Sequence, residues 1–70
     1  MDAFLSKVAE ILEVTSVAAD FDFRTVEDWD SMKGFSLIVM MEGDYGKSMT
    51  VDQFMACKTV GDLAKFAGVI

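Results

Sequence analysis

Residues 27–41 read EDWDSMKGFSLIVMM and join a charged segment to an almost uninterrupted apolar run. Asp30 followed by Ser31 is typical of a helix start, because an aspartate side chain can accept a hydrogen bond from a free backbone N–H of the first turn. Apolar residues then recur at helical spacing as far as Tyr45. The pattern therefore predicts a helix over residues 31–45 with Asp30 as its N-cap.

This helix is apolar on more than one face. A chain of 70 residues cannot bury a helix on every side, so one face should meet another protein or a ligand. Gly34 lies in the first turns, where glycine costs roughly 1 kcal/mol relative to alanine. Either the chain tolerates this cost, or another group approaches the backbone closely at this point.

Three further helices are predicted. The first covers residues 3–13, with Asp2 as its cap and an apolar stripe on one side. The next covers residues 50–58, where Thr50 and Gln53 form a capping box and Val51, Phe54 and Met55 should face inward. The last covers residues 59–67, between the cap Thr59 and Gly68.

Residues 14–30 lack a helical period and are expected to form a long ordered loop. Its apolar side chains would hold it against the core: Phe21, Phe23, Val26 and Trp29. No alternation typical of strands occurs. We therefore predict an all-α fold, a small four-helix bundle of three main helices and one short helix, in a single domain over residues 1–70.

The composition argues against an enzyme. The chain has no histidine and one cysteine, so it contains no Ser-His or Cys-His nucleophile, no internal disulfide and no cysteine-based metal site. We expect Cys57 to be buried or half-buried and inert. A net charge of −6 disfavours nucleic acid and anionic membranes as partners. The apolar run 37–41 is too short to cross a bilayer, so the expected location is the cytoplasm.

Ser31 is the candidate for chemistry. A hydroxyl at the first helical position lies where the helix dipole tolerates an anion. Without a base in this chain, Ser31 would have to be the substrate of another enzyme. Asp30 could orient the hydroxyl or help to hold a magnesium ion in that enzyme. Plain helix capping is the alternative interpretation.

Taken together, four segments resemble the acyl carrier proteins of the phosphopantetheine-binding family, over nearly the full chain. Residues 29–32 resemble the family's Asp-Ser-Leu motif, with Met32 in place of leucine. The apolar helix over 35–41 follows, then an acidic residue and an aromatic within 42–45. The threonine-capped segment 59–63 resembles the start of the family's last helix.

The resemblance implies that a phosphopantetheinyl transferase moves 4′-phosphopantetheine from coenzyme A onto Ser31, beside Asp30. The thiol of the arm would carry an acyl or aminoacyl group as a thioester and present it to a loading ligase and to downstream synthases or transferases. By analogy with the family's recognition helix, five residues would face the arm and the partner enzymes: Met32, Lys33, Phe35, Ser36 and Val39. The chain is expected to act as a monomer.

The other face of this helix should pack inward. Its expected residues are Leu37, Ile38, Met41 and Tyr45, against Leu5, Val8, Leu12, Leu63 and Phe66. Phe54 and Met55 could line a cleft that shelters an acyl chain, as in some family members. We favour the alternative that both are ordinary core residues.

The charge pattern departs from that of carriers in fatty acid synthesis, whose second helix is usually strongly acidic. Here the first half of that helix offers Lys33 and Ser36, and much of the negative charge lies in the loop: Asp20, Asp22, Glu27, Asp28 and Asp30. This pattern favours a specialised pathway, such as polyketide, peptide, D-alanine or cell-surface polysaccharide assembly. The alternative from another functional class is an unmodified acidic helical adaptor that binds a basic protein.

Overall fold

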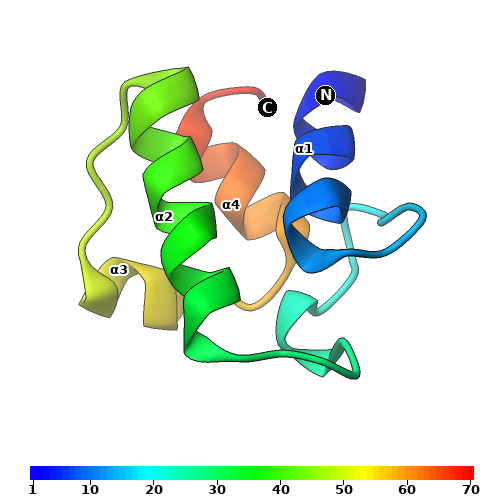
Figure 1. Ribbon diagram of the computed structural model, residues 1–70. Helices are drawn as coiled ribbons and strands as arrows, with labels where there is room; N and C mark the ends of the chain where they lie inside the picture. Colours follow the sequence, from blue (N-terminus) through cyan, green and yellow to red (C-terminus); the bar gives the residue numbers. More distant parts are fainter.

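The computed structural model describes all 70 residues and contains four α-helices and no β-strand (Figure 1). The predicted all-α bundle is therefore confirmed. Between α1 and α2 lies a long connection that contains one short 3-10 turn, η1. The elements are α1 (Asp2–Leu12), η1 (Phe23–Thr25), α2 (Ser31–Tyr45), α3 (Val51–Ala56) and α4 (Val60–Ala67).

The core combines one stripe from each of the helices α1, α2 and α4 with four residues from elsewhere in the chain: Phe23, Met49, Phe54 and Cys57. In Figure 1, α4 lies between α1 and α2, and α1 packs against both of them. The predicted inward residues of α2 are confirmed: Leu37 and Met41 are fully buried, and Ile38 and Tyr45 lie partly buried at the edge. Their expected neighbours are buried or pack on the core: Leu5, Val8, Leu12, Leu63 and Phe66.

The caps of the last two helices are formed by local side chains, as the sequence predicts. The Thr50 hydroxyl accepts a hydrogen bond from the Gln53 N–H at 3.1 Å, and the Gln53 side chain accepts one from the Thr50 N–H at 2.9 Å. Thr59 caps α4 in the same way, with Asp62 as its reciprocal partner. The N–H groups of Lys58 and Thr59 both donate to the Asp62 carboxylate and hold its pKa below the ordinary value.

The predicted cap of α1 is wrong. The helix begins at Asp2 itself, after Met1, and no side chain caps it. Asp2 therefore lies inside the first turn. There its negative charge still complements the positive end of the helix dipole, although it accepts no capping hydrogen bond.

The helix α3 is shorter than predicted and ends at Ala56 instead of residue 58. The guanidinium of Arg24 donates to the carbonyl oxygens of Phe54 at 2.8 Å and Cys57 at 2.6 Å. These contacts satisfy carbonyl groups at the end of the helix, where Cys57 turns to an extended conformation.

The predicted inward face of α3 is wrong for two of its three residues. Val51 is 67% exposed and Met55 is 64% exposed, whereas Phe54 is buried. The stripe that enters the core consists of Phe54 and the following Cys57, three positions apart. A helix of six residues buries only one such stripe, and its side chains at 51 and 55 point to solvent.

The connection between α1 and α2 is held against the core, as predicted. Phe23 is fully buried, and Phe21, Val26 and Trp29 pack partly buried around it. The connection also contacts the start of α4, where the Gly61 N–H donates to the Ala19 carbonyl at 2.6 Å. A Cβ at Gly61 would lie 3.0 Å from that oxygen, so glycine permits the close approach.

None of the helices combines the length and the apolar character needed to span a bilayer.

Candidate functional site

Ser31 is the first residue of α2 and is exposed where the long connection enters that helix. Helix capping at this point is performed by its neighbour, because the carboxylate of Asp30 accepts a hydrogen bond from the Lys33 N–H at 2.9 Å. The prediction of Asp30 as N-cap is confirmed. The Ser31 hydroxyl makes no hydrogen bond within the protein. The serine is therefore not required for the cap.

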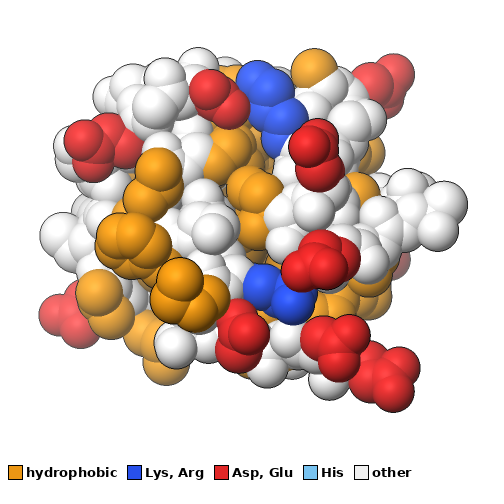
Figure 2. Space-filling model, viewed as in Figure 1, with side chains coloured by type: hydrophobic (Ala, Val, Ile, Leu, Met, Phe, Trp, Pro, Cys, Tyr) orange, Lys and Arg blue, Asp and Glu red, His pale blue; other side chains and the backbone are white.

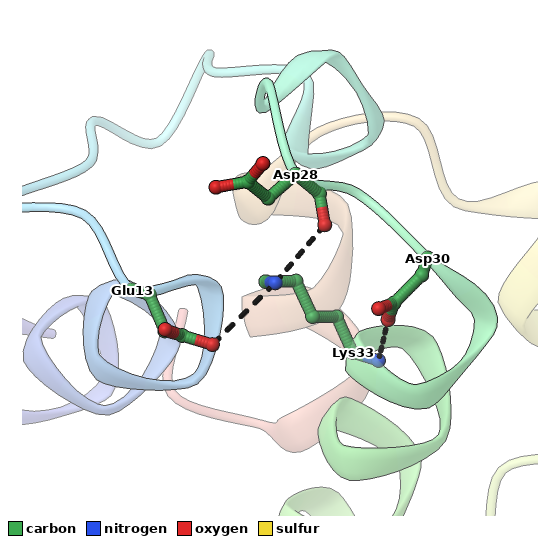
Figure 3. A network of polar contacts seen from close by, with 4 residues as sticks. All are labelled: Glu13, Asp28, Asp30 and Lys33. Carbon is green, nitrogen blue, oxygen red and sulfur yellow. Dashed lines mark hydrogen bonds and ion pairs between the residues drawn. The ribbon is translucent and has the colours of Figure 1, made fainter.

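Lys33 joins three segments beside Ser31 (Figure 3). Its ammonium group donates to the Asp28 carbonyl at 3.0 Å and lies 3.5 Å from the Glu13 carboxylate. The contacts link the start of α2 to the end of α1 and to the end of the connection. The Lys33 side chain is only 11% exposed. This predicted partner residue thus faces acidic and carbonyl groups of its own chain.

Three aromatic side chains, Phe23, Trp29 and Phe54, pack together and form what we call the aromatic cluster. The rings of Trp29 and Phe54 are nearly parallel, with centroids 6.4 Å apart, and the Phe23 ring lies 5.3 Å from Phe54. A Cβ at Gly34 would meet Phe54 at 3.3 Å and Trp29 at 3.4 Å. Gly34 therefore lies where aromatic rings approach the α2 backbone, which is the second of the two explanations for this glycine.

The outer face of α2 carries large exposed apolar side chains. Met32 is 70% exposed, Phe35 is 62% exposed and Val39 is 51% exposed, and Ser36 is exposed beside them. Figure 2 shows hydrophobic atoms gathered over α2 and α3. We call this the apolar surface and define it by five residues: Met32, Phe35, Val39, Val51 and Met55.

The α3 part of the apolar surface was missed from the sequence, because Val51 and Met55 occur at a spacing that equally suits an inward stripe. Only the orientation of α3, which depends on contacts with distant residues, separates the two possibilities. Three acidic residues near this surface in sequence are exposed: Asp30, Glu42 and Asp52.

Cys57 is buried, as predicted, and is a free cysteine. Burial raises the pKa of its thiol, the nearby Asp62 charge raises it further, and Arg24 acts in the opposite direction. At neutral pH the thiol is therefore protonated, which makes it a poor nucleophile.

Residues 2–67 match a family model described as a phosphopantetheine attachment site. The chain belongs to this phosphopantetheine-binding family. The match spans all four helices and places Ser31 well inside it. Searches of curated proteins and of solved structures found no match.

Membership of the family gives the chain a general role. Proteins of the phosphopantetheine-binding family carry covalently attached 4′-phosphopantetheine, so the chain is a carrier that bears this group. Carrier domains are not catalytic themselves, and they generally interact with transferases and synthases. An exposed hydroxyl at the start of a 15-residue helix fits such a group, because no neighbouring side chain makes a hydrogen bond with it.

Proposed function

We propose that Ser31 is the attachment residue of 4′-phosphopantetheine and that the chain, as one domain over residues 1–70, carries acyl or aminoacyl groups in the cytoplasm. The observation that carries this proposal is the exposed Ser31 hydroxyl, which makes no hydrogen bond while Asp30 alone caps α2. A hydroxyl with no structural task can be modified without loss of a native contact.

The transfer requires a simple exchange of bonds. The Ser31 oxygen forms a bond to the phosphorus that bears pantetheine, the pyrophosphate bond of coenzyme A breaks, and adenosine 3′,5′-bisphosphate leaves. The hydroxyl proton passes to a base of the transferase, since this chain has no histidine and is not its own catalyst. When bound, the arm supplies a thiol that holds the cargo as a thioester.

The start of α2 suits the new negative charge. The backbone N–H groups of Ser31 and Met32 have no hydrogen-bond partner in the protein, and they lie at the positive end of the helix dipole. The Asp30 carboxylate repels a second anion, whereas the free N–H groups and the helix dipole attract one. A phosphodiester is therefore tolerated at this position.

The proposed partners are a phosphopantetheinyl transferase, a loading ligase and downstream synthases or transferases. They would contact the exposed side of α2, where Met32, Phe35, Ser36 and Val39 follow Ser31. Lys33 belongs to this side in sequence, but its ammonium group is engaged with Asp28 and Glu13. The first half of α2 thus offers partner enzymes exposed side chains and little free charge. This difference from the strongly acidic helix of fatty acid carriers supports a specialised pathway.

Intact mass measurement tests the attachment. The purified chain is incubated with coenzyme A, magnesium and a transferase of broad specificity, and the expected result is a gain of one phosphopantetheine group. No gain, in a sample whose circular dichroism spectrum is helical, would contradict the proposal. That outcome would favour the unmodified adaptor, which would use the same apolar surface and its exposed acids to bind a basic protein.

The reactivity of thiols provides an independent check at the same step. Before transfer, the native chain should react slowly with Ellman's reagent, because Cys57 is buried and its pKa is raised. A raised pKa leaves less thiolate at a given pH, so the slow reaction should accelerate only at alkaline pH. After transfer, one thiol should react fast while Cys57 stays slow. A fast native Cys57 would contradict the burial seen here.

A further inference from the structure

The space between α2 and α3, behind the exposed start of α2, is filled by the Phe54 ring. Phe54 is only 6% exposed. Its ring lies against the backbone of α2 at Gly34, against Trp29 and against Phe23. The ring therefore occupies the space between the two helices, and a further chain could enter only by displacing it.

Arg24 holds Phe54 in this position. Its guanidinium lies 5.0 Å from the centroid of the Phe54 ring and donates to the carbonyl oxygens of Phe54 and Cys57. Hydrogen bonds from a charged donor are stronger than neutral ones. Moving α3 away from α2 and from η1 would break both hydrogen bonds and separate the rings of the aromatic cluster.

We propose that Phe54, packed on Gly34, closes the bundle to cargo, so that an alkyl chain carried at Ser31 stays outside the core. The inference rests on the proposed attachment at Ser31. An alkyl chain gains free energy by leaving water, in proportion to the area it buries. Entry between α2 and α3 would first expel a packed phenyl ring, which forfeits a comparable burial. Apolar cargo therefore meets the apolar surface instead.

The hollow of about 540 Å³ beside α1 is no substitute. It is lined by α1 and by residues 14–17, and it includes the carboxylate residues Asp2 and Glu10. No residue of α2 or α3 lines it. A closed bundle therefore suits cargo that loses little free energy when it is exposed to water, namely short acyl, polar acyl or aminoacyl groups.

Methionine methyl groups report directly on where the cargo lies. The phosphopantetheinyl transferase would attach acetyl- or octanoyl-phosphopantetheine to Ser31 from acetyl- or octanoyl-coenzyme A. Intact mass would verify the loading. Buried Met40, Met41 and Met49 report on the core, whereas Met32 and Met55 are exposed. We expect 13C-methyl signals of the exposed pair alone to depend on chain length. Melting temperatures of the two loaded forms should agree within about 2 °C.

Shifts of the buried methyl signals, or a melting temperature several degrees higher for the octanoyl form, would overturn the closed bundle. Phe54→Ala and the milder Phe54→Leu open the space and should reverse the result: octanoyl should then stabilise the protein and shift the buried signals. Met55→Ala, on the same helix but at a side chain that is 64% exposed, is the matched control and should behave as the parent. If octanoyl loading also leaves the melting temperature and the buried methyl signals of both Phe54 variants unchanged, Phe54 is excluded as the closing residue.

The two proposals fail separately. Absence of transfer in the mass spectrum would contradict attachment at Ser31 and would leave the closed bundle to be tested chemically. Ser31→Cys would then be alkylated with N-ethylmaleimide or N-octylmaleimide, a reaction that the buried Cys57 should not share. The methyl signals and melting temperatures are read by the same criteria, so either result decides whether a chain at position 31 enters the core.

Discussion

Ser31→Ala is expected to abolish the gain of phosphopantetheine completely while leaving the folded protein almost unchanged. The parent should be modified to completion under conditions in which the variant shows no mass gain. The free energy of unfolding should change by no more than about 0.5 kcal/mol, as for an exposed residue that makes no special contact. Both quantities are measurable on the same samples, by intact mass and by urea titration.

The reason lies in the division of tasks at the start of α2. Asp30 caps the helix through the Lys33 N–H, and the Ser31 hydroxyl has no partner within the protein. Removing that hydroxyl therefore removes only the acceptor of the arm. Ser6→Ala, which changes an exposed serine of α1, is the matched control and should be modified like the parent. Modification of the Ser31→Ala variant would place the arm elsewhere.

A carrier and an adaptor should respond differently to Ser31→Ala. An unmodified adaptor would bind its partner equally well with serine or alanine at position 31. A carrier would lose every step that follows loading, although its exposed face at Phe35 and Val39 is intact. Loss of pathway function without loss of fold is therefore the result that separates the two classes.

The parts of the fold that depend on local spacing were predictable from the sequence. The inward stripe of α2, the Asp30 cap, the capping box at Thr50 and the Thr59 cap each depend on residues within a few positions of one another. The anchoring of the long connection was also predictable, because aromatic residues in a polar segment have no other way to leave water. Ser31 was also identifiable from the local sequence, because it is a hydroxyl residue at the start of a predicted helix.

The parts that depend on distant contacts were not predictable. Arg24 reaches carbonyl groups 30 and 33 positions away, and this contact fixes where α3 ends and which of its sides is exposed. Nothing in the sequence near Arg24 marks it as a cap for another helix. The contact of Lys33 is equally hard to predict, because its partner Glu13 precedes the long connection in sequence and Lys33 follows it. The sequence places Lys33 on the partner face, whereas the position of α1 brings its ammonium group to Glu13.

Phe23→Ala is expected to unfold a large fraction of the protein. Phe23 is fully buried, and its ring contacts Trp29, Phe54 and the guanidinium of Arg24, which lies 4.6 Å from the ring centroid. Truncation of such a phenylalanine typically costs about 3–5 kcal/mol. A domain of this size has a total stability of only about 3–5 kcal/mol from its core. Urea titration followed by circular dichroism measures the loss directly.

Phe35→Ala provides the matched control, because it removes the same group from a side chain that is 62% exposed, and it should cost less than about 0.5 kcal/mol. A loss below about 1 kcal/mol for Phe23→Ala would mean that the connection is not part of the folded unit. The same truncation should also slow the modification of Ser31. Trp29 and Asp30 precede Ser31 directly, and Trp29 packs on the same ring that Phe23 supports. A buried phenylalanine eight positions before Ser31 therefore helps to hold the start of α2, and the modification rate of Phe23→Ala should fall in step with its folded fraction.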